Sequence, residues 1–237
     1  MAGPRLTGMH IPAGTRAVLY DLDGTLVDHD HAARAGVDAW CAELGLPGGQ
    51  WDRWRDIERR WFTRFEQGRV SHLGQRIERC REFLGRPDLS DEEALAFYER
   101  YLTVYRASWR AFDDALPSLT QALSRGLHVG ILTNGAETMQ RRKLEATGLW
   151  LDGMVMLATV ELGAPKPSPE AYSGAMSALG VGAGETVMIG DSWPNDVAGP
   201  RRAGMSAIYL LRDGVARERH VPRDEPVVSS LEQIVWE

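Results

Sequence analysis

The chain has 237 residues, of which 43% are hydrophobic and 25% are charged, and these fractions are typical of a globular protein with a sizeable core. Its net charge of -6 argues against binding to a nucleic acid polymer, because such proteins are usually basic or carry a basic stripe. The two cysteines, Cys41 and Cys80, support neither a disulfide framework nor a cysteine zinc site. The sequence contains neither a recognisable signal peptide nor the roughly 18-residue apolar run of a membrane helix, so we expect a soluble, cytoplasmic protein.

Strand-like and helix-like segments alternate along most of the chain. Residues 1–16 contain proline and glycine without periodicity, and we interpret them as a leader before the first strand. Strands that alternate with helices of this length predict right-handed βαβ units, and therefore an α/β fold with a Rossmann-like, doubly wound parallel sheet. The predicted strands are 17–20, 127–132, 154–157, 186–190 and 206–211, and the predicted helices are 137–146, 168–179 and 195–203.

Residues 30–112 interrupt this alternation. They contain no convincing strand and are rich in arginine, glutamate and aromatic residues at helical spacing. We therefore predict that residues 1–29 and 113–237 form the α/β core and that residues 30–112 form an inserted, all-α cap.

Two patterns within the predicted cap indicate helices. Ser90 followed by Glu93 predicts a capping box at the start of a helix over 90–105. A stripe of apolar side chains at helical spacing predicts a buried helix face rather than a substrate-binding platform. The residues of this stripe are Trp51, Trp54, Ile57, Trp61 and Phe65.

Two carboxylates follow the first predicted strand of the core. Asp21 and Asp23 come directly after the apolar run 17–20, and residues two apart in an extended chain point the same way. Gly24 then permits a sharp turn. Because open parallel sheets bind ligands at the carboxyl ends of their strands, we expect both carboxylates to lie in a ligand site.

Further polar side chains are expected at the same edge of the sheet. Those that follow two other predicted strands are Thr133, Asn134, Asp191, Asn195 and Asp196. Lys166 lies between two prolines, just before a helix whose expected N-cap is Ser168. Only Lys166 and Lys143 among the 27 basic residues are lysines, so the choice of lysine at position 166 favours a site that needs a compact point charge.

These residues form four motifs, and their order and spacing resemble those of the haloacid dehalogenase-like superfamily. The resemblance extends from about residue 17 to about residue 211, with the helical block where the family's inserted cap usually lies. Residues 140–149 are most similar to the nucleotidase and N-acylneuraminate phosphatase-like branch. The four motifs are Asp21-x-Asp23-Gly24-Thr25, Thr133-Asn134-Gly135, Lys166-Pro167 and Gly190-Asp191-Ser192-Trp193-Pro194-Asn195-Asp196.

The resemblance implies a Mg²⁺-dependent phosphatase that hydrolyses a small phosphate monoester through an aspartyl-phosphate intermediate. Asp21 would be the nucleophile. Asp23 would protonate the leaving oxygen and then activate water, which would require its pKa to be raised above the reference value of about 3.9. Mg²⁺ would be held by Asp21, Asp191 and the main-chain carbonyl of Asp23.

The remaining motif residues would bind or organise the phosphate. The resemblance implies phosphate binding by Gly24, Thr133, Asn134 and Lys166, with Thr133 and Lys166 also taking part in catalysis. Asp196 and Asn195 would support the residues that contact the metal and the phosphate. Asp196 would do so by orienting Asp191, Lys166 or a metal-bound water.

The expected partner is a small phosphorylated metabolite, such as a nucleotide, a sugar phosphate or phosphoglycolate. Neither a nucleic acid polymer nor a membrane is expected, and monomer and homodimer both remain open. Three alternatives are a sugar-phosphate mutase, a 2-haloacid dehalogenase, and a non-catalytic phosphate-binding regulatory protein. A mutase would need a base from the cap, for which His72 is the candidate, but we expect His72 to be a solvent-facing histidine. Asp23 and Asp191 argue against a dehalogenase. We do not expect Asp28–His31 to bind metal, because side chains this close in sequence rarely converge without distant partners.

Overall fold

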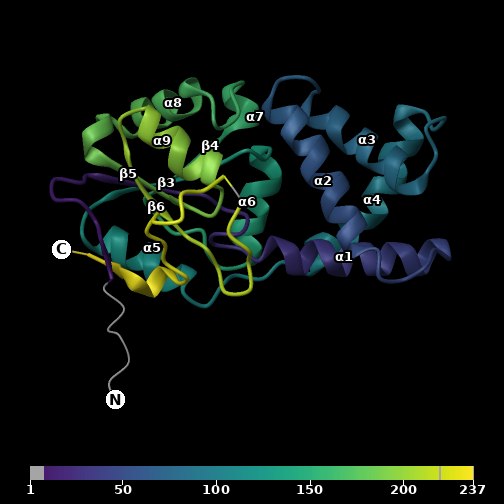
Figure 1. The fold of residues 1–237 in the computed structure, drawn as a ribbon, viewed down its shortest axis with the longest axis horizontal. Helices are drawn as coiled ribbons and strands as arrows, with labels where there is room; N and C mark the ends of the chain where they lie inside the picture. The colour runs from purple at the N-terminus through teal and green to yellow at the C-terminus, as the bar shows by residue number, and fades with distance from the viewer. Residues whose placement is uncertain (1–7, 219, 237) are drawn as a thin grey trace, which may run out of the picture. The chain divides into compact units, whose positions relative to one another are not determined.

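The computed structural model describes residues 8–218 and 220–236, and it divides the chain into two compact units. One unit is formed by the chain up to Asp28 together with the chain from Ala111 onward, and the other by His29–Arg110 (Figure 1). At the boundary, Val27 and Ala111 form an antiparallel bridge, and the Phe112 amide donates to the Leu26 carbonyl at 3.0 Å. The chain therefore leaves the first unit and returns to it at adjacent points.

The first unit is built on a parallel sheet with five strands in the described part of the chain, in the order β4-β3-β2-β5-β6. All five predicted strands are present, with ends shifted by up to two residues. This confirms the α/β fold with a parallel sheet. Their bounds are β2 Ala17–Tyr20, β3 His128–Thr133, β4 Met154–Ala158, β5 Thr186–Gly190 and β6 Ser206–Tyr209.

Helices cover both faces of this sheet, and alternation along β2 supplies an apolar surface to each. Val18 and Tyr20 pack in one cluster with Leu119 of helix α5, Ala115–Ser124. Leu19 packs in the opposite cluster with Tyr172 of helix α8, Pro169–Leu179. Figure 1 shows α5 and α8 on opposite sides of the strands. The helices of this unit are α5 Ala115–Ser124, α6 Glu137–Ala146, α7 Thr159–Leu162, α8 Pro169–Leu179 and α9 Gly199–Arg202.

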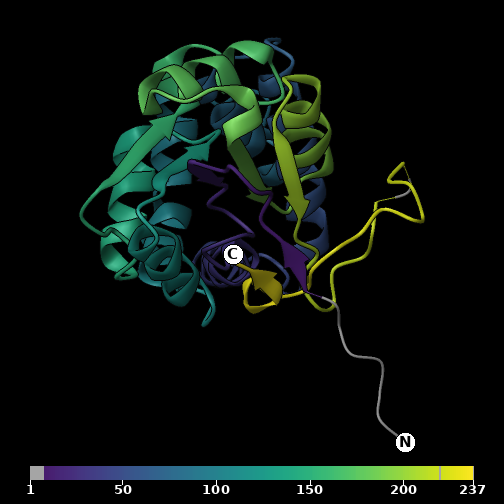
Figure 2. The same cartoon turned by 90° about the vertical axis from the view of Figure 1, so that its left-hand side faces the viewer.

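One sequence prediction for this unit is wrong, and a second is confirmed with a different type of helix. Residues 9 and 10 of the expected leader form strand β1, Met9–His10, which pairs in parallel with β7, Ile234–Val235, as Figure 2 shows for the purple and yellow arrows. The expected helix over 195–203 is present, but its first part is a π-helix, η2 Trp193–Ala198, and its last part is α9. The type changes next to Pro200, which has no amide hydrogen to continue the ladder of η2. β1 was missed because its partner comes from the other end of the chain.

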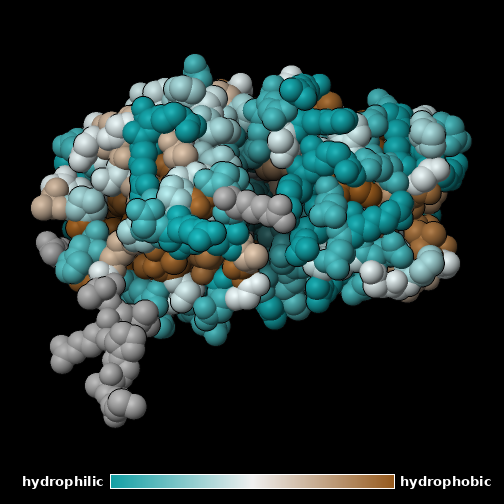
Figure 3. Space-filling model, viewed as in Figure 1, coloured by the Kyte–Doolittle hydropathy of each residue, from teal (hydrophilic) through white to brown (hydrophobic). Residues whose placement is uncertain are grey.

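The second unit is helical and surrounds its own aromatic core. Its helices are α1 His29–Leu44, α2 Trp51–Glu66, α3 His72–Leu84 and α4 Asp91–Ala107. Trp40 stacks on Phe83 with ring centroids 5.2 Å apart, and Trp54 lies 4.7 Å from Tyr101. The side chains on the face shown in Figure 3 are mostly hydrophilic, as expected for helices that bury only one stripe each.

Both helix predictions for this unit are confirmed. The Ser90 side chain accepts from the Glu93 amide and the Glu93 carboxylate accepts from the Ser90 amide, which is the predicted capping box. The apolar stripe of α2 faces the core, with Trp54 fully buried, while Trp61 is half-buried and donates to Glu82 at 2.7 Å. Within the described residues, none of the helices combines the length and apolarity needed to cross a membrane.

Candidate active site

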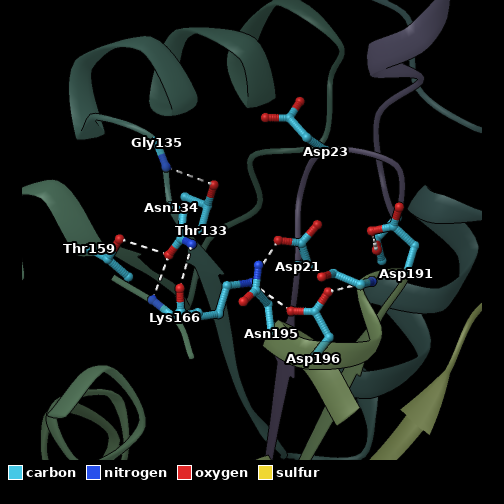
Figure 4. A network of polar contacts seen from close by, with 12 residues as sticks. Asp21, Asp23, Thr133, Asn134, Gly135, Thr159, Lys166, Asp191, Asn195 and Asp196 are labelled. Carbon is cyan, nitrogen blue, oxygen red and sulfur yellow. Dashed lines mark hydrogen bonds and ion pairs between the residues drawn. The ribbon is translucent and has the colours of Figure 1, made fainter. Parts of the chain in front are cut away.

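The site lies where β2, β3 and β5 end, at the carboxyl edge of the sheet. Since β2 is the central strand with β3 and β5 on either side, Asp21, Thr133 and Asp191 come from three adjacent strands. Figure 4 shows Asp21, Asp191, Asp196 and Lys166 gathered in one network. The sequence-predicted residues from four separate motifs therefore meet at this edge.

Lys166 is the cation at the centre of this network. Its ammonium lies 2.8 Å from Asp21 Oδ1 and 2.7 Å from Asp196 Oδ1, and only 1% of the residue is exposed. Burial acts to lower the pKa of Lys166, but the charges and hydrogen bonds of Asp196 and Asp21 outweigh it and raise the pKa above its ordinary value. The lysine therefore remains charged.

Asn134 holds the Lys166 segment in place. The Asn134 side-chain oxygen accepts from the Lys166 amide at 2.8 Å and from the Thr159 hydroxyl at 3.0 Å, while its side-chain nitrogen donates to the Lys166 carbonyl at 2.9 Å. This buried amide thus joins the end of β3 to the loop before α8. The phosphate contact predicted for Asn134 remains a prediction, and these bonds engage both ends of its side chain.

Asp21, Asp191 and Asp196 each place a carboxylate oxygen within 4.8 Å of the others. Burial, opposed by Lys166 and aided by Asp196 and Asp23, raises the pKa of Asp21 to about 7. Burial, followed by the charges of Asp21 and Asp196, raises the pKa of Asp191 well above its ordinary value. Two buried carboxylates, Asp21 and Asp196, and the half-buried carboxylate of Asp191 share one ammonium, which leaves excess negative charge, and hard oxygen ligands of this kind suit Mg²⁺. The residues therefore fit a divalent cation.

Asp196 differs from the other two acids in how its oxygens are used. Oδ1 contacts Lys166, and Oδ2 accepts from the Ser192 amide at 2.9 Å. The side chain is fully buried, and Asn195, just before it, accepts from the Tyr172 hydroxyl at its carbonyl at 2.6 Å. Asp196 is thus engaged at both carboxylate oxygens and Asn195 is held through its carbonyl by α8, whereas Asp21 and Asp191 have more oxygen capacity left for a cation.

Two glycines allow the acidic segments to approach closely. Gly24 has φ +88°, and a Cβ there would lie 2.2 Å from Asp191 Oδ2. At Gly190 a Cβ would lie 2.4 Å from the Asp196 carboxyl group. Gly24 therefore permits both the turn after Asp23 and the close approach of Asp191. The phosphate contact predicted for Gly24 remains a prediction.

The Asp23 side chain does not belong to the Asp21–Asp191–Asp196 cluster. Figure 4 shows its carboxylate turned away from them. It forms an ion pair with Lys143 and accepts from Gln140 Nε2 at 2.8 Å, both from α6. Donors stabilise a carboxylate in its ionised form, so these contacts do not account for the proton that an acid role requires.

Gln140 and Lys143 were missed as site residues in the sequence. Gln140 also donates to the Thr133 hydroxyl at 2.7 Å, so it links the first two motifs. The available signal was the rarity of lysine, because Lys143 is one of only two in the chain. Hydrophobic periodicity over residues 137–146 could not have identified Gln140 and Lys143, because both are polar although they are buried.

Other sequence candidates lie in the helical unit. Burial and the charges of Arg76 and Arg79 lower the pKa of His72 to about 4, and its ring packs 5.3 Å from Phe65, so it is half-buried rather than solvent-facing. His29 contacts Tyr105 and Glu58, each at 3.1 Å. Within residues 8–218 and 220–236, the acidic group with metal-ligand spacing is the one at Asp21, and it does not include Asp28–His31.

Comparison with known proteins agrees with this geometry. The haloacid dehalogenase-like hydrolase family matches residues 15–204. A phosphatase of Mycobacterium tuberculosis, MT3486, is 33% identical over 208 residues, covering 85% of this chain and 90% of its own. The human N-acylneuraminate-9-phosphatase is 26% identical and covers 91% and 90% of the two chains.

A solved structure shares the fold. The HAD-hydrolase YfnB from Bacillus subtilis, crystallised with magnesium, superposes with a TM-score of 0.80 over 92% of this chain and 96% of its own, at 20% identity. At this identity the likeness shows the fold, while the family match covers most of the chain and includes all four motifs. The chain belongs to the haloacid dehalogenase-like hydrolases.

Proposed function

We propose that the protein is a Mg²⁺-dependent phosphatase that hydrolyses a small phosphate monoester through an aspartyl-phosphate on Asp21. The observation that carries this proposal is the Asp21 carboxylate, which ends the central strand beside both Lys166 and two further acids. The phosphatases among its relatives support the same reaction class.

Electrostatics explains why these residues are needed together. A carboxylate that approaches a phosphate dianion meets like-charge repulsion of about 4 kcal/mol per unit pair at 4 Å and an effective dielectric of 20. Lys166 offsets part of this repulsion. Asp21, Asp191 and the Asp23 carbonyl would hold Mg²⁺, which would neutralise further charge on the phosphate oxygens.

Asp23 and Thr133 would complete the reaction. Asp23 would give a proton to the leaving oxygen as the phosphorus–oxygen bond breaks, and would then take a proton from the water that attacks phosphorylated Asp21. The donors on Asp23 favour the ionised form that this second step uses. The Thr133 hydroxyl, buried beside Gln140, would donate to the transferring phosphate.

The alternatives receive less support from the geometry. A dehalogenase requires neither a metal nor a second aspartate, whereas here Asp191 and Asp23 both lie at the same edge. Release of chloride from a 2-haloacid would favour a dehalogenase. Formation of a rearranged sugar phosphate in place of free phosphate would favour a mutase. Absence of turnover on a broad phosphate panel with Mg²⁺ would favour a regulatory protein.

The deciding experiment measures p-nitrophenyl phosphate hydrolysis with Mg²⁺ for the wild type and Asp21→Asn. We expect kcat to fall by more than about a thousandfold, because the amide cannot act as nucleophile. Asp152→Asn, an exposed acid of the same unit, is the matched control and should retain wild-type kcat. Wild-type turnover by Asp21→Asn would exclude the proposal. A screen of small phosphates, ranked by kcat/KM, would then identify the substrate.

A further inference from the structure

Helix α6 carries two buried polar side chains that face the site. Gln140 and Lys143 are 3% and 1% exposed, and their three-residue separation places them on the same face of the helix. Lys143 pairs with Asp23, and Gln140 contacts both Asp23 and Thr133. The basic residues between them point elsewhere, since Arg142 is exposed and Arg141 packs over the Trp150 ring at 3.7 Å.

A buried ammonium is costly unless its charge is compensated. Lys143 has its partner in Asp23, whose side chain remains 31% exposed toward solvent. The Asp23 carboxylate is therefore accessible to solvent, while the Lys143 ammonium that holds it is buried. A second anchor, through Gln140 Nε2, ties the same carboxylate to the hydroxyl at the end of β3.

We propose that Gln140 and Lys143 act as positioning residues that hold the Asp23 carboxylate in place for proton transfer to and from the substrate oxygen. The proposal rests on the proposed phosphatase function. A group that gives a proton in one step and takes one from water in the next must keep its place in both, and misplacement by about 1 Å can cost a hundredfold in rate. Neither residue would touch the phosphate itself.

The choice of leaving group separates this role from a purely structural one. p-Nitrophenolate leaves without a proton, whereas an aliphatic alkoxide needs one as its bond to phosphorus breaks. Lys143→Met should therefore lower kcat/KM by about 30-fold for the best aliphatic phosphate in the screen and by less than about threefold for p-nitrophenyl phosphate. Arg142→Met, which removes an exposed positive charge from the same helix, should leave both values unchanged.

Asp23→Asn provides the second half of the test. If Lys143 acts through Asp23, then adding Lys143→Met to Asp23→Asn should cause no further loss on the aliphatic substrate. Lys143→Arg, which retains the charge, should recover part of the activity. Gln140→Met, which leaves no buried charge unpaired, should show the same substrate-selective loss even if Lys143→Met does not fold by circular dichroism.

The outcomes are distinguishable. Equal losses on both substrates, a loss that persists in the Asp23→Asn background, or activity equal to that of Arg142→Met would each overturn the positioning role while leaving the phosphatase intact. A wild type that hydrolyses no phosphate ester with Mg²⁺ would instead refute the proposed function. A selective loss that disappears in the Asp23→Asn background supports the inference.

Discussion

Charge at individual residues dominates the candidate site. Asp21, Asp191 and Asp196 share one ammonium, Lys166, and all four groups are largely withdrawn from water. In the metal-free protein the raised pKa of Asp21, about 7, means that the folded state binds more protons than the unfolded state between about pH 4 and 7. The contribution of Asp21 to stability is therefore greatest at low pH and falls as the pH rises through this window.

Magnesium should reverse this loss, because a cation binds the ionised carboxylates and competes with protons. We expect saturating MgCl₂ to raise Tm by about 5–10 °C at pH 7.5, as for a ligand at 100 times its Kd, and by clearly less at pH 5.5. Thermal unfolding in MgCl₂ and in EDTA measures this at both pH values. Asp191→Asn should abolish the shift, and a shift of equal size at both pH values would contradict the prediction.

Individual residues also show how far local sequence can be interpreted. The sequence predicts Asp21 and Asp191 at one sheet edge because they follow strands, and Lys166 near them because it precedes a helix of the core, and the structure brings the three together. Asp23 was expected with them, yet its side chain is held by α6. Alternation along an extended strand predicts the direction in which a side chain points. Asp23 lies beyond the end of β2, where the turn at Gly24 sets the direction of its side chain instead.

At the level of elements, Arg212 joins segments that are far apart in the chain. Its guanidinium contacts both carboxylate oxygens of Asp114 at 2.5 and 2.8 Å, donates to the Thr25 carbonyl at 2.6 Å and lies 4.0 Å over the Phe112 ring. Asp114 also accepts from the Ser230 hydroxyl and the Leu231 amide. The pair thereby connects the turn after β2, the start of α5 and the C-terminal segment.

Removing this arginine should leave a buried acid without its counter-charge. We expect Arg212→Met to lower the free energy of unfolding by about 3–5 kcal/mol, and the exposed Arg223→Met to leave it nearly unchanged. Burial acts to raise the pKa of Asp114, but hydrogen bonds from Arg212, Ser230 and Leu231 lower it overall.

The pH dependence of Arg212→Met checks the same cause. Because the folded pKa of Asp114 is lowered, the stability it contributes is present above about pH 4 and is lost as the pH falls further. The difference between wild type and Arg212→Met should therefore shrink below about pH 4. Urea unfolding at pH 7 and pH 3.5 measures it, and a constant difference would show that lost packing on Phe112 is the cause instead.

The elements themselves differ in how well they could be predicted. The five strands of the main sheet and helix α6 are apolar or periodic enough for local sequence to identify them. β1 is two residues long and exists through pairing with β7, at the opposite end of the chain. The π-helix η2 depends on bonds such as that from the Gly199 amide to the Pro194 carbonyl, five residues back, and the pattern of residue types does not distinguish this spacing from that of an α-helix.

On the scale of the whole molecule, the helical unit is an insertion whose two ends meet. Val27 and Ala111 are bridged, so residues 29–110 can be replaced by a short glycine–serine turn without stretching the core. The sheet and the Asp21, Lys166 and Asp191 site belong entirely to the core, whereas the helical unit packs around a separate aromatic cluster of its own. The role of this unit as a cap that selects substrate is a prediction.

The deletion tests that role. We expect the shortened protein to hydrolyse p-nitrophenyl phosphate with a reduced kcat and to discriminate among aliphatic phosphates at least about tenfold less than the wild type, by the spread of kcat/KM over one panel. Circular dichroism checks that the core is folded. An unchanged ranking with an unchanged spread would place specificity in the core.

The sequence by itself determined the family and the parallel sheet of this protein: alternating strands and helices predict the sheet, and four motifs, three after predictable strands and one before a predictable helix, identify the family. These features depend on local periodicity and on residue types that one reaction requires. Only the tertiary structure decided which groups surround each carboxylate, because the partners of Asp23 and Asp114 come from 98 or more residues away. Burial and counter-charge arise when those distant segments pack, and no local pattern records them.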